Sequence, residues 1–149
     1  YCNDNFDNVF MSVGTSKWDE LLESVKLFTN SKLILMHCVS SYPSEYKDAN
    51  IAKLKYLKKL VGHVGYSDHI FGIESCKVAM QYGLDVIEKH FTIDRDLPGR
   101  DNKFAILPEE LSELSNYIKI FEDMHMFHGL DYLPCEEGSR MHYAGRFNR

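Results

Sequence analysis

The feature that most constrains the fold of this 149-residue chain is an alternation of strand-like and helix-like segments. The period is about 30 residues, as judged from the hydrophobic pattern. Short apolar runs typical of strands occupy residues 8–12, 32–38, 64–67 and 85–91. Segments with a helical apolar stripe follow them at residues 18–28, 51–60 and 73–82, and a fourth helix is expected from Pro108 onward. Four β-then-α units in succession predict a parallel sheet with right-handed crossovers.

The length of the repeating part favours one kind of parallel sheet. A complete (β/α)8 barrel takes roughly 250 residues, so four of its units take about 125. Residues 8 to 124 have that length. We therefore predict an α/β fold, a partial TIM (β/α)8 barrel of four consecutive units, within residues 1–130. A flavodoxin-like open sheet is the alternative, but polar residues at several strand ends favour the barrel.

The remaining segment, residues 131–149, is predicted to be an irregular tail, and it carries three arginines. These are Arg140, Arg146 and Arg149. The chain begins with a polar, acidic stretch and without methionine, so we expect an internal piece of a longer protein with no signal peptide at this point.

Charge and cysteine usage narrow the class of protein. The net charge is −5 with no basic run, which argues against nucleic acid or an anionic membrane surface as the main partner. No apolar stretch approaches the roughly 20 residues that a membrane-spanning helix needs. The four cysteines are scattered with no CxxC pair, so we predict reduced thiols, a cytoplasmic protein and no zinc site built from cysteines.

Two predicted strands each deliver a histidine at their carboxyl end. The string VGYSDH ends at His69, and DVIEKHF carries His90. Alternate side chains of a strand share a face, so Ser67 lies on the face of His69, and Glu88 lies on the face of His90. Ile87 and Phe91 take the opposite face, which suits packing against helices. Two imidazoles arriving from neighbouring strands, with a carboxylate beside them, predict a shared metal ion.

Each of these residues also has a plainer interpretation. Either histidine alone can be a hydrogen-bonded structural residue, and Glu88 can act as a general base, orient His90, bind a hydroxyl or pair with a lysine. Asp68 can orient a ring or belong to the turn. His37 has the parity of the core leucines of its strand and is predicted to be structural.

Loops after the strands add further polar candidates. Ser40 and Tyr42 follow the second strand in the string SSYP, where such groups commonly hold an anionic or hydroxylated ligand. Asp101, in the string LPGRD, can bind sugar hydroxyls, or it can be an ordinary loop acid.

Several strings in the chain resemble the sialic acid synthase family, which comprises N-acetylneuraminate synthase and its legionaminate and pseudaminate relatives. The strings are HCVSSYP, VGYSDHIFGIE, DVIEKHFTIDRDLPGRD and LPEEL, in the family's order and spacing, and SVGTS near the start is similar to the family's first strand end. The resemblance covers nearly all of residues 9–121.

The resemblance implies a TIM-barrel enzyme that condenses phosphoenolpyruvate with an open-chain amino sugar. The products would be phosphate and a nine-carbon 2-keto-3-deoxy acid. It also implies that His69 and His90 hold a divalent metal, Mn²⁺ or Mg²⁺, which polarises the sugar aldehyde, and that Glu88 is the acid of the conserved motif. The positions that it matches to phosphoenolpyruvate are Ser12, Ser40 and Ser67. Those that it matches to the amino sugar are Tyr42 and Asp101.

The sequence departs from the family in ways that leave alternatives open. Arg100 and Asn102 flank Asp101 where the family often has Pro and His, which bears on the choice of sugar. The chain starts at the expected fifth strand of the barrel, and the tail is similar to the linker that leads to a C-terminal antifreeze-like domain. We therefore expect an isolated half barrel to be inactive and the full-length form to be a homodimer. A non-catalytic binding or regulatory remnant, and a related phosphoenolpyruvate-dependent synthase, are the other interpretations.

Overall fold

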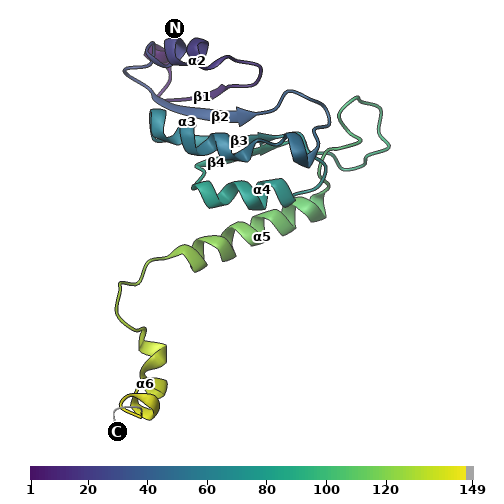
Figure 1. Cartoon of the computed structure of the whole chain (residues 1–149). Helices are drawn as coiled ribbons and strands as arrows, with labels where there is room; N and C mark the ends of the chain where they lie inside the picture. Colours follow the sequence, from purple (N-terminus) through teal and green to yellow (C-terminus); the bar gives the residue numbers. More distant parts are fainter. Residues whose placement is uncertain (147–149) are drawn as a thin grey trace. The chain divides into compact units, whose positions relative to one another are not determined.

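The computed structural model describes residues 1–146, and these divide into two compact units, Tyr1–Tyr117 and a second unit that begins at Ile118. The first unit holds a four-stranded parallel sheet in the order β1-β2-β3-β4 (Figure 1). The strands are β1 (Asn8–Ser12), β2 (Lys32–Cys38), β3 (Val64–Asp68) and β4 (Val86–Lys89). Neighbours in sequence are neighbours in space, as four βα units predict.

The helices follow the strands much as the apolar stripes predict, with shorter regular parts. They are α2 (Trp18–Val25), α3 (Leu54–Val61), α4 (Glu74–Ala79) and α5 (Pro108–His125). Turns of 3₁₀ helix precede α3 at Ile51–Lys53 and follow α4 at Met80–Tyr82, where we predicted continuous helices. A short helix α1 (Cys2–Asn5) opens the chain, and Oδ1 of Asn3 accepts hydrogen bonds from the backbone before β2.

The core lies between the sheet and the helices α3 and α4, which cover one face of β2 and β3 (Figure 1). We call this the helix face. Its side chains include the fully buried Leu35, Val64 and Tyr66, packed with Leu54 and Leu57 of α3. On the other, concave face, a Cβ on Gly65 would lie 2.4 Å from Sδ of Met36 and from Cγ1 of Val86, so the three strands approach closely there. This arrangement is a half barrel.

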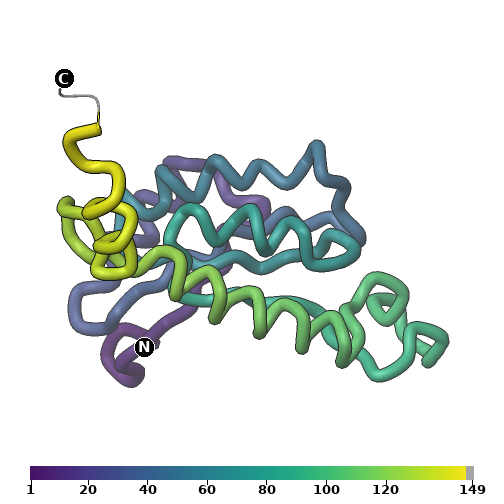
Figure 2. Tube along the Cα trace, turned by 90° about the horizontal axis from the view of Figure 1, so that it is seen from below, coloured from purple at the N-terminus to yellow at the C-terminus, as the bar shows by residue number. Residues whose placement is uncertain are grey.

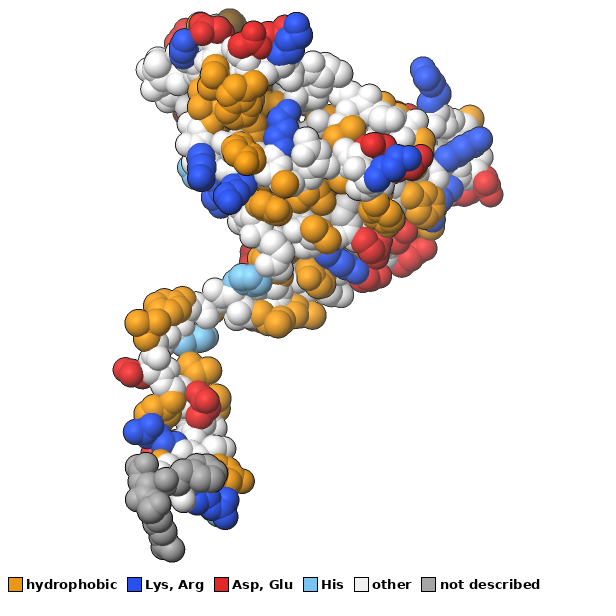
Figure 3. All heavy atoms as spheres, viewed as in Figure 1, with side chains coloured by type: hydrophobic (Ala, Val, Ile, Leu, Met, Phe, Trp, Pro, Cys, Tyr) orange, Lys and Arg blue, Asp and Glu red, His pale blue; other side chains and the backbone are white. Residues whose placement is uncertain are grey.

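The concave face is only partly covered by the residues that the structure describes. Phe10 of β1 is 57% exposed, and Glu88 of β4 is also exposed. On the opposite side, where α3 and α4 lie in front of the sheet in Figure 1, Figure 3 shows hydrophobic side chains exposed among acidic and basic ones. Phe91, predicted to pack against helices, is half exposed, because β4 ends at Lys89 and Phe91 belongs to the loop that follows.

The loop between β4 and α5 projects beyond the carboxyl end of the sheet (Figure 1, Figure 2). It returns to the sheet where Phe91 pairs with Ile106 in a single parallel bridge. Arg95 fixes the loop, donating hydrogen bonds to the carbonyl of Ala105 and to Glu110 of α5. Asp101, one of the predicted site residues, is therefore held over the strand ends by a braced loop.

The end of the chain corrects one prediction. Residues 131–149 were predicted to be irregular, but Pro134–Glu136 form a 3₁₀ turn that leads into α6 (Glu137–Tyr143). Proline at the first position and the bond from the Leu133 N–H to the Glu136 carboxylate explain why a helix starts there. Arg140 lies in α6, Arg146 follows it, and Arg149 lies outside the described residues.

The boundary between the two compact units falls inside α5, after Tyr117. The domain limit at residue 130 stays a prediction. Of the residues of α5, only Leu114 is buried, so the later turns of this helix add little to the core of the first unit. Among residues 1–146, no helix combines the length and the apolarity that crossing a membrane requires.

Candidate functional site

His69 and His90 meet at the carboxyl end of the sheet. His69 directly follows β3 and His90 directly follows β4, and the residues before them, Asp68 and Lys89, are partners in the strand register. The two imidazole rings therefore lie beside each other, with centroids 5.2 Å apart and planes inclined by 61°. The sequence interpretation required this convergence. The role of the pair in metal binding remains a prediction.

His69 is buried, and its hydrogen bonding fixes the proton on one nitrogen. Nδ1 lies 3.2 Å from the carbonyl oxygen of Val39 and 3.8 Å from Sγ of Cys38. A carbonyl only accepts, so Nδ1 carries the hydrogen and the lone pair resides on Nε2. Burial lowers the pKa of His69, which the bond to Val39 partly opposes and the neighbouring His90 reinforces. A neutral imidazole with a free Nε2 lone pair is the form that binds metals.

His90 is the more open of the two rings, with a third of its side chain exposed. Its ring packs against Phe104 at a centroid distance of 5.1 Å. Nδ1 lies 3.9 Å from Oδ2 of Asp101, which is too long for a hydrogen bond but close enough for attraction to a charged ring. The structure thus brings the predicted sugar-binding Asp101 to the histidine pair.

Tyr42 forms one wall of the site. It comes from the loop after β2, and its ring lies 4.2 Å from that of His69 and 6.2 Å from that of His90. Phe104 lies 6.4 Å from Tyr42 and closes the same wall. The ring of Tyr42 is half exposed, so one side remains available to a ligand.

Ser67 and Glu88 lie one layer deeper on the concave face. They are direct partners in the register of β3 and β4, and the Ser67 hydroxyl donates a 2.7 Å hydrogen bond to Oε1 of Glu88. Ser67 is buried and Glu88 is exposed on the concave face. Among residues 1–146, the ion pairs that the structure shows do not join Glu88 to a lysine, and the neighbouring Lys89 points to the helix face and pairs with Asp68.

The other two predicted serines, Ser40 and Ser12, have fewer contacts with the residues of the site. Oγ of Ser40 lies 3.7 Å from Sγ of Cys38, which in turn contacts His69. Ser12 ends β1 at the same edge of the sheet, and its Oγ accepts a 3.4 Å hydrogen bond from the backbone of Gly14. In the part of the chain that the structure describes, the contacts found for Ser12 do not link it to either imidazole.

Asp68 and His37, whose roles the sequence left to the structure, both face the helices. His37 is structural as predicted: its Nε2 lies 2.8 Å from the carbonyl oxygen of Ala49, and its ring stacks on Tyr66. Asp68 is buried beside Lys89 and takes part in the turn through a bond from the Ile70 N–H. The suggestion that Asp68 hydrogen-bonds a histidine ring is not supported by its contacts.

Sequence reasoning missed three components of the site. They are the Val39 carbonyl that fixes His69, the thiol of Cys38 between Ser40 and His69, and the ring of Phe104 against His90. A backbone carbonyl carries no residue signature, and an apolar ring resembles any core residue. Only Cys38 had a detectable signal, since it shares the strand parity of Ser40.

The number of side chains that can ligate a metal ion at this site is small. Among residues 1–146, no cluster of three or more His, Cys, Asp and Glu side chains is arranged to hold a metal ion. A divalent cation held by the two predicted imidazole ligands would therefore have to complete its coordination with water, substrate or groups from elsewhere. The neutral Nε2 of His69 and the nearby ring of His90 fit that arrangement.

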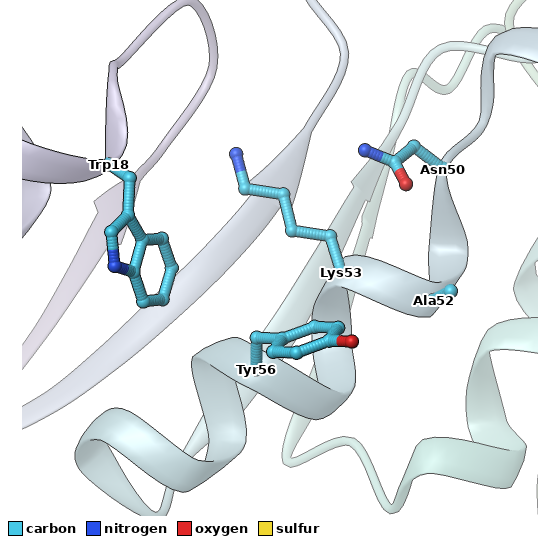
Figure 4. A pocket seen from close by; sticks show the side chains of 5 residues that line it. All are labelled: Trp18, Asn50, Ala52, Lys53 and Tyr56. Atoms are coloured by element: carbon cyan, nitrogen blue, oxygen red, sulfur yellow. The ribbon is translucent and has the colours of Figure 1, made fainter.

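A separate pocket of about 270 Å³ lies away from the histidines (Figure 4). Trp18 of α2 and Tyr56 of α3 face each other across it, with Lys53 between them. Its lining is mostly apolar and comes from the helices that cover the sheet. The predicted site residues lie at the strand ends instead.

The comparisons with known proteins agree with this geometry. The model of the NeuB family matches residues 1–127. An uncharacterised protein of Methanocaldococcus jannaschii is 43% identical over 120 residues, which cover 78% of this chain and 36% of that protein. The N,N'-diacetyllegionaminic acid synthase of Legionella pneumophila is 43% identical over 88 residues, which cover 58% of this chain and 25% of that protein.

Solved structures share the fold. The N-acetylneuraminic acid synthetase of Leptospira borgpetersenii, solved with citrate, superposes with a TM-score of 0.81 at 35% identity over 95% of this chain and 50% of that one. The spore coat polysaccharide biosynthesis protein of Bacillus subtilis superposes with a TM-score of 0.69 at 32% identity, covering 76% of this chain and 34% of that one. This chain thus spans about a third or less of the two curated relatives and half of the Leptospira chain. With a family model matched over residues 1–127 and a half barrel like that of a sialic acid synthetase, this chain belongs to the NeuB family.

Proposed function

We propose that this chain supplies the metal-binding half of the active site of a synthase that condenses phosphoenolpyruvate with an N-acetylated amino sugar similar to N-acetylmannosamine. One observation carries the proposal: two imidazoles from adjacent strand ends lie 5.2 Å apart, with an aromatic wall and a carboxylate beside them. Membership of the family and the sialic acid synthetase fold support the reaction class.

In this proposal His69 and His90 hold a divalent cation, Mn²⁺ or Mg²⁺. When bound, the cation would act as a Lewis acid on the carbonyl oxygen of the sugar aldehyde. Tyr42 and Asp101 lie around the imidazoles, so they bind and orient the sugar. Ser12, Ser40 and Ser67 bind phosphoenolpyruvate along the strand ends.

The reaction forms a bond between C3 of phosphoenolpyruvate and the aldehyde carbon, whose oxygen takes up a proton. Water then adds at C2 and gives up one proton, which balances the proton taken up by the aldehyde oxygen. The bond between C2 and the phosphate oxygen then breaks, the proton of the new C2 hydroxyl leaves with inorganic phosphate, and the C2 oxygen from water becomes the ketone of the 2-keto acid. Glu88 is the proposed proton acceptor for the water. Its carboxylate accepts the Ser67 hydrogen bond through one oxygen, which orients the other oxygen over the concave face.

The proposal also covers the rest of the barrel, the oligomeric state and the location of the complete enzyme. The phosphate and carboxylate charges of phosphoenolpyruvate need cations, which the complementary half of the barrel is expected to provide. We propose that the complete enzyme is a cytoplasmic homodimer that uses small-molecule substrates and no nucleic acid. The net charge of −5 and the scattered cysteines are consistent with that setting.

A chimeric enzyme tests the function directly. The segment of the Leptospira synthetase that this chain matches is replaced by this chain, and phosphate release is measured with phosphoenolpyruvate, N-acetylmannosamine and Mn²⁺. The expected result is phosphate release that depends on all three components and is abolished by His69→Ala or His90→Ala. His128→Ala, which alters an exposed histidine of the second unit, is the control. Turnover at the unsubstituted level in either of the first two variants would refute the metal assignment.

A further inference from the structure

A buried ion pair lies directly behind the two histidines. Asp68 and Lys89 are partners in the β3–β4 register, and Nζ of Lys89 lies 2.8 Å from Oδ2 of Asp68. Their side chains are 0% and 5% exposed. Strand alternation puts both on the helix face, while the next residue of each strand, His69 or His90, lies at the concave side.

The polar groups around Asp68 are satisfied within the protein. Its carboxylate accepts hydrogen bonds from Tyr66 Oη at 3.0 Å and Ser75 Oγ at 2.6 Å, and Cys76 Sγ lies 3.2 Å away. This cluster therefore has no vacancy for a ligand. A buried ion pair is often no more stabilising than apolar residues of the same size, so overall stability does not by itself account for it.

Asp68, which precedes His69, and Lys89 both form hydrogen bonds with the backbone of Ile70, which follows it. Oδ1 of Asp68 accepts a 3.0 Å bond from the Ile70 N–H, and Nζ of Lys89 donates to the carbonyl of Ile70. The carbonyl of His69 itself accepts a 2.9 Å bond from the Ser44 N–H. His69 thus stands between two anchored residues, Asp68 and Ile70.

Lys89 connects this anchored turn to the second histidine, which it immediately precedes. The carbonyl of His90 accepts a 2.8 Å bond from the Ile106 N–H, which fixes the far side of that residue. The ammonium group of Lys89, the residue before His90, is therefore bonded to the backbone of Ile70, the residue after His69. Because the β3–β4 ladder ends at this point, no further ladder bonds hold the two histidines in register.

We propose that Asp68 and Lys89 are positioning residues that set the spacing of His69 and His90 so that both imidazoles bind one divalent cation. This inference rests on the proposed function. A site with only two protein ligands depends on their mutual distance, because a displacement of about 0.5 Å is enough to loosen such a constellation. Neither residue of the pair touches the cation or the substrates.

The test uses Mn²⁺ as the probe and the ¹⁵N-labelled chain. Bound Mn²⁺ broadens the signals of nearby nuclei, so the imidazole signals of His69 and His90 each report a midpoint of the titration. The main variant is Asp68→Asn with Lys89→Met, which removes both charges together and leaves no unpaired buried ion. The matched control is Lys77→Met, which removes a lysine whose ion pair with Glu113 is on the surface of the same unit.

In the unsubstituted chain and in Lys77→Met, both imidazole signals are expected to broaden with one shared midpoint. In the double variant the melting temperature should stay near the unsubstituted value, while Mn²⁺ affinity falls roughly 10- to 100-fold. A purely stabilising role would lower the melting temperature and leave the Mn²⁺ affinity of the folded variant unchanged. Unchanged affinity with a shared midpoint in the folded double variant would overturn the inference.

A second variant decides the matter if the double variant does not fold. Lys89→Arg keeps the ion pair, but its longer, planar head group changes the bond to the Ile70 carbonyl. Mn²⁺ affinity is expected to fall several-fold, and unchanged titration curves would overturn the inference. If Mn²⁺ broadens neither imidazole in the unsubstituted chain, the proposed function fails and this inference fails with it. If Mn²⁺ broadens both imidazole signals with the same affinity in the unsubstituted chain and in the variants, only the positioning role fails.

Discussion

The hydroxyl of Ser67 donates a 2.7 Å hydrogen bond to Oε1 of Glu88 across the β3–β4 register. This bond joins a predicted phosphoenolpyruvate-binding serine to the predicted proton acceptor. Both side chains lie on the concave face, one step before the strand ends that carry the histidines. In the proposed reaction, substrate contact and proton transfer would thus be coupled through one pair of adjacent strands.

Replacing Glu88 by Gln should separate proton transfer from metal binding. The amide keeps an oxygen that accepts the Ser67 bond but does not take up a proton, so kcat of the chimeric enzyme should fall by about 10²- to 10⁴-fold. Mn²⁺ affinity should stay unchanged. Steady-state phosphate release and an Mn²⁺ titration measure the two quantities. Glu113→Gln is the control, and a kcat at the unsubstituted level in Glu88→Gln would contradict the role.

Tyr42 should influence metal binding through its ring and sugar binding through its hydroxyl. Its ring lies 4.2 Å from His69, and such aromatic contacts contribute about 0.5–1.5 kcal/mol. Tyr42→Ala is therefore expected to weaken Mn²⁺ binding by up to about tenfold. Tyr42→Phe should keep Mn²⁺ affinity and raise KM for the sugar. Tyr46→Ala, an exposed tyrosine a few residues later, should change neither, and equal titrations of Tyr42→Ala and the unsubstituted chain would count against the contact.

Gly65→Ala tests how closely the strands approach on the concave face. The added Cβ would lie 2.4 Å from both Met36 Sδ and Val86 Cγ1, so side chains or strands must shift. We expect the free energy of unfolding to fall by about 1–3 kcal/mol, as overpacking usually costs. Urea denaturation measures it. In Gly138→Ala the added Cβ meets nothing within 4 Å, so no loss is expected there, and an equal effect of the two changes would argue against crowding at Gly65.

His37 should make stability depend on pH. Burial lowers the pKa of His37, which the bond to the Ala49 carbonyl partly opposes. In the unfolded chain its pKa is near the ordinary histidine value of 6.5, so as the pH falls below 6.5 the unfolded state takes up a proton first and stability decreases. Above that pH both states are neutral and the contribution is complete.

His37→Gln removes this titration but keeps an N–H donor for Ala49. The free energy of unfolding of the variant, measured by urea denaturation between pH 5 and pH 7.5, should fall less steeply with decreasing pH than that of the unsubstituted chain. The difference between the two curves isolates His37 from the other titrating groups. Parallel curves would show that His37 does not contribute.

Much of the fold was predictable because it depends on local periodicity. The alternation of strand and helix patterns gave the order of the units, and strand parity put Ser67 and Glu88 on one face and His37 on the other. Helix ends were less predictable. A 3₁₀ turn differs from an α-helix by a small change of backbone angles, and the apolar stripe is the same for both.

The tail shows a different kind of limit. It was predicted to be irregular because its apolar residues form no long stripe, but α6 begins there after Pro134 and the bond of Leu133 to Glu136. These capping signals are short and readable in the sequence.

By itself, the sequence determined which residues stand at the ends of β3 and β4 and which face each takes, because side-chain parity is a property of the extended backbone. Only the tertiary structure decided how far apart the two imidazoles lie, which nitrogen of His69 is free, and that Asp68 and Lys89 grip the turn behind them. Those facts depend on register and on backbone carbonyls brought together from distant segments. Such contacts arise from packing, and no spacing of residue types along the chain encodes them.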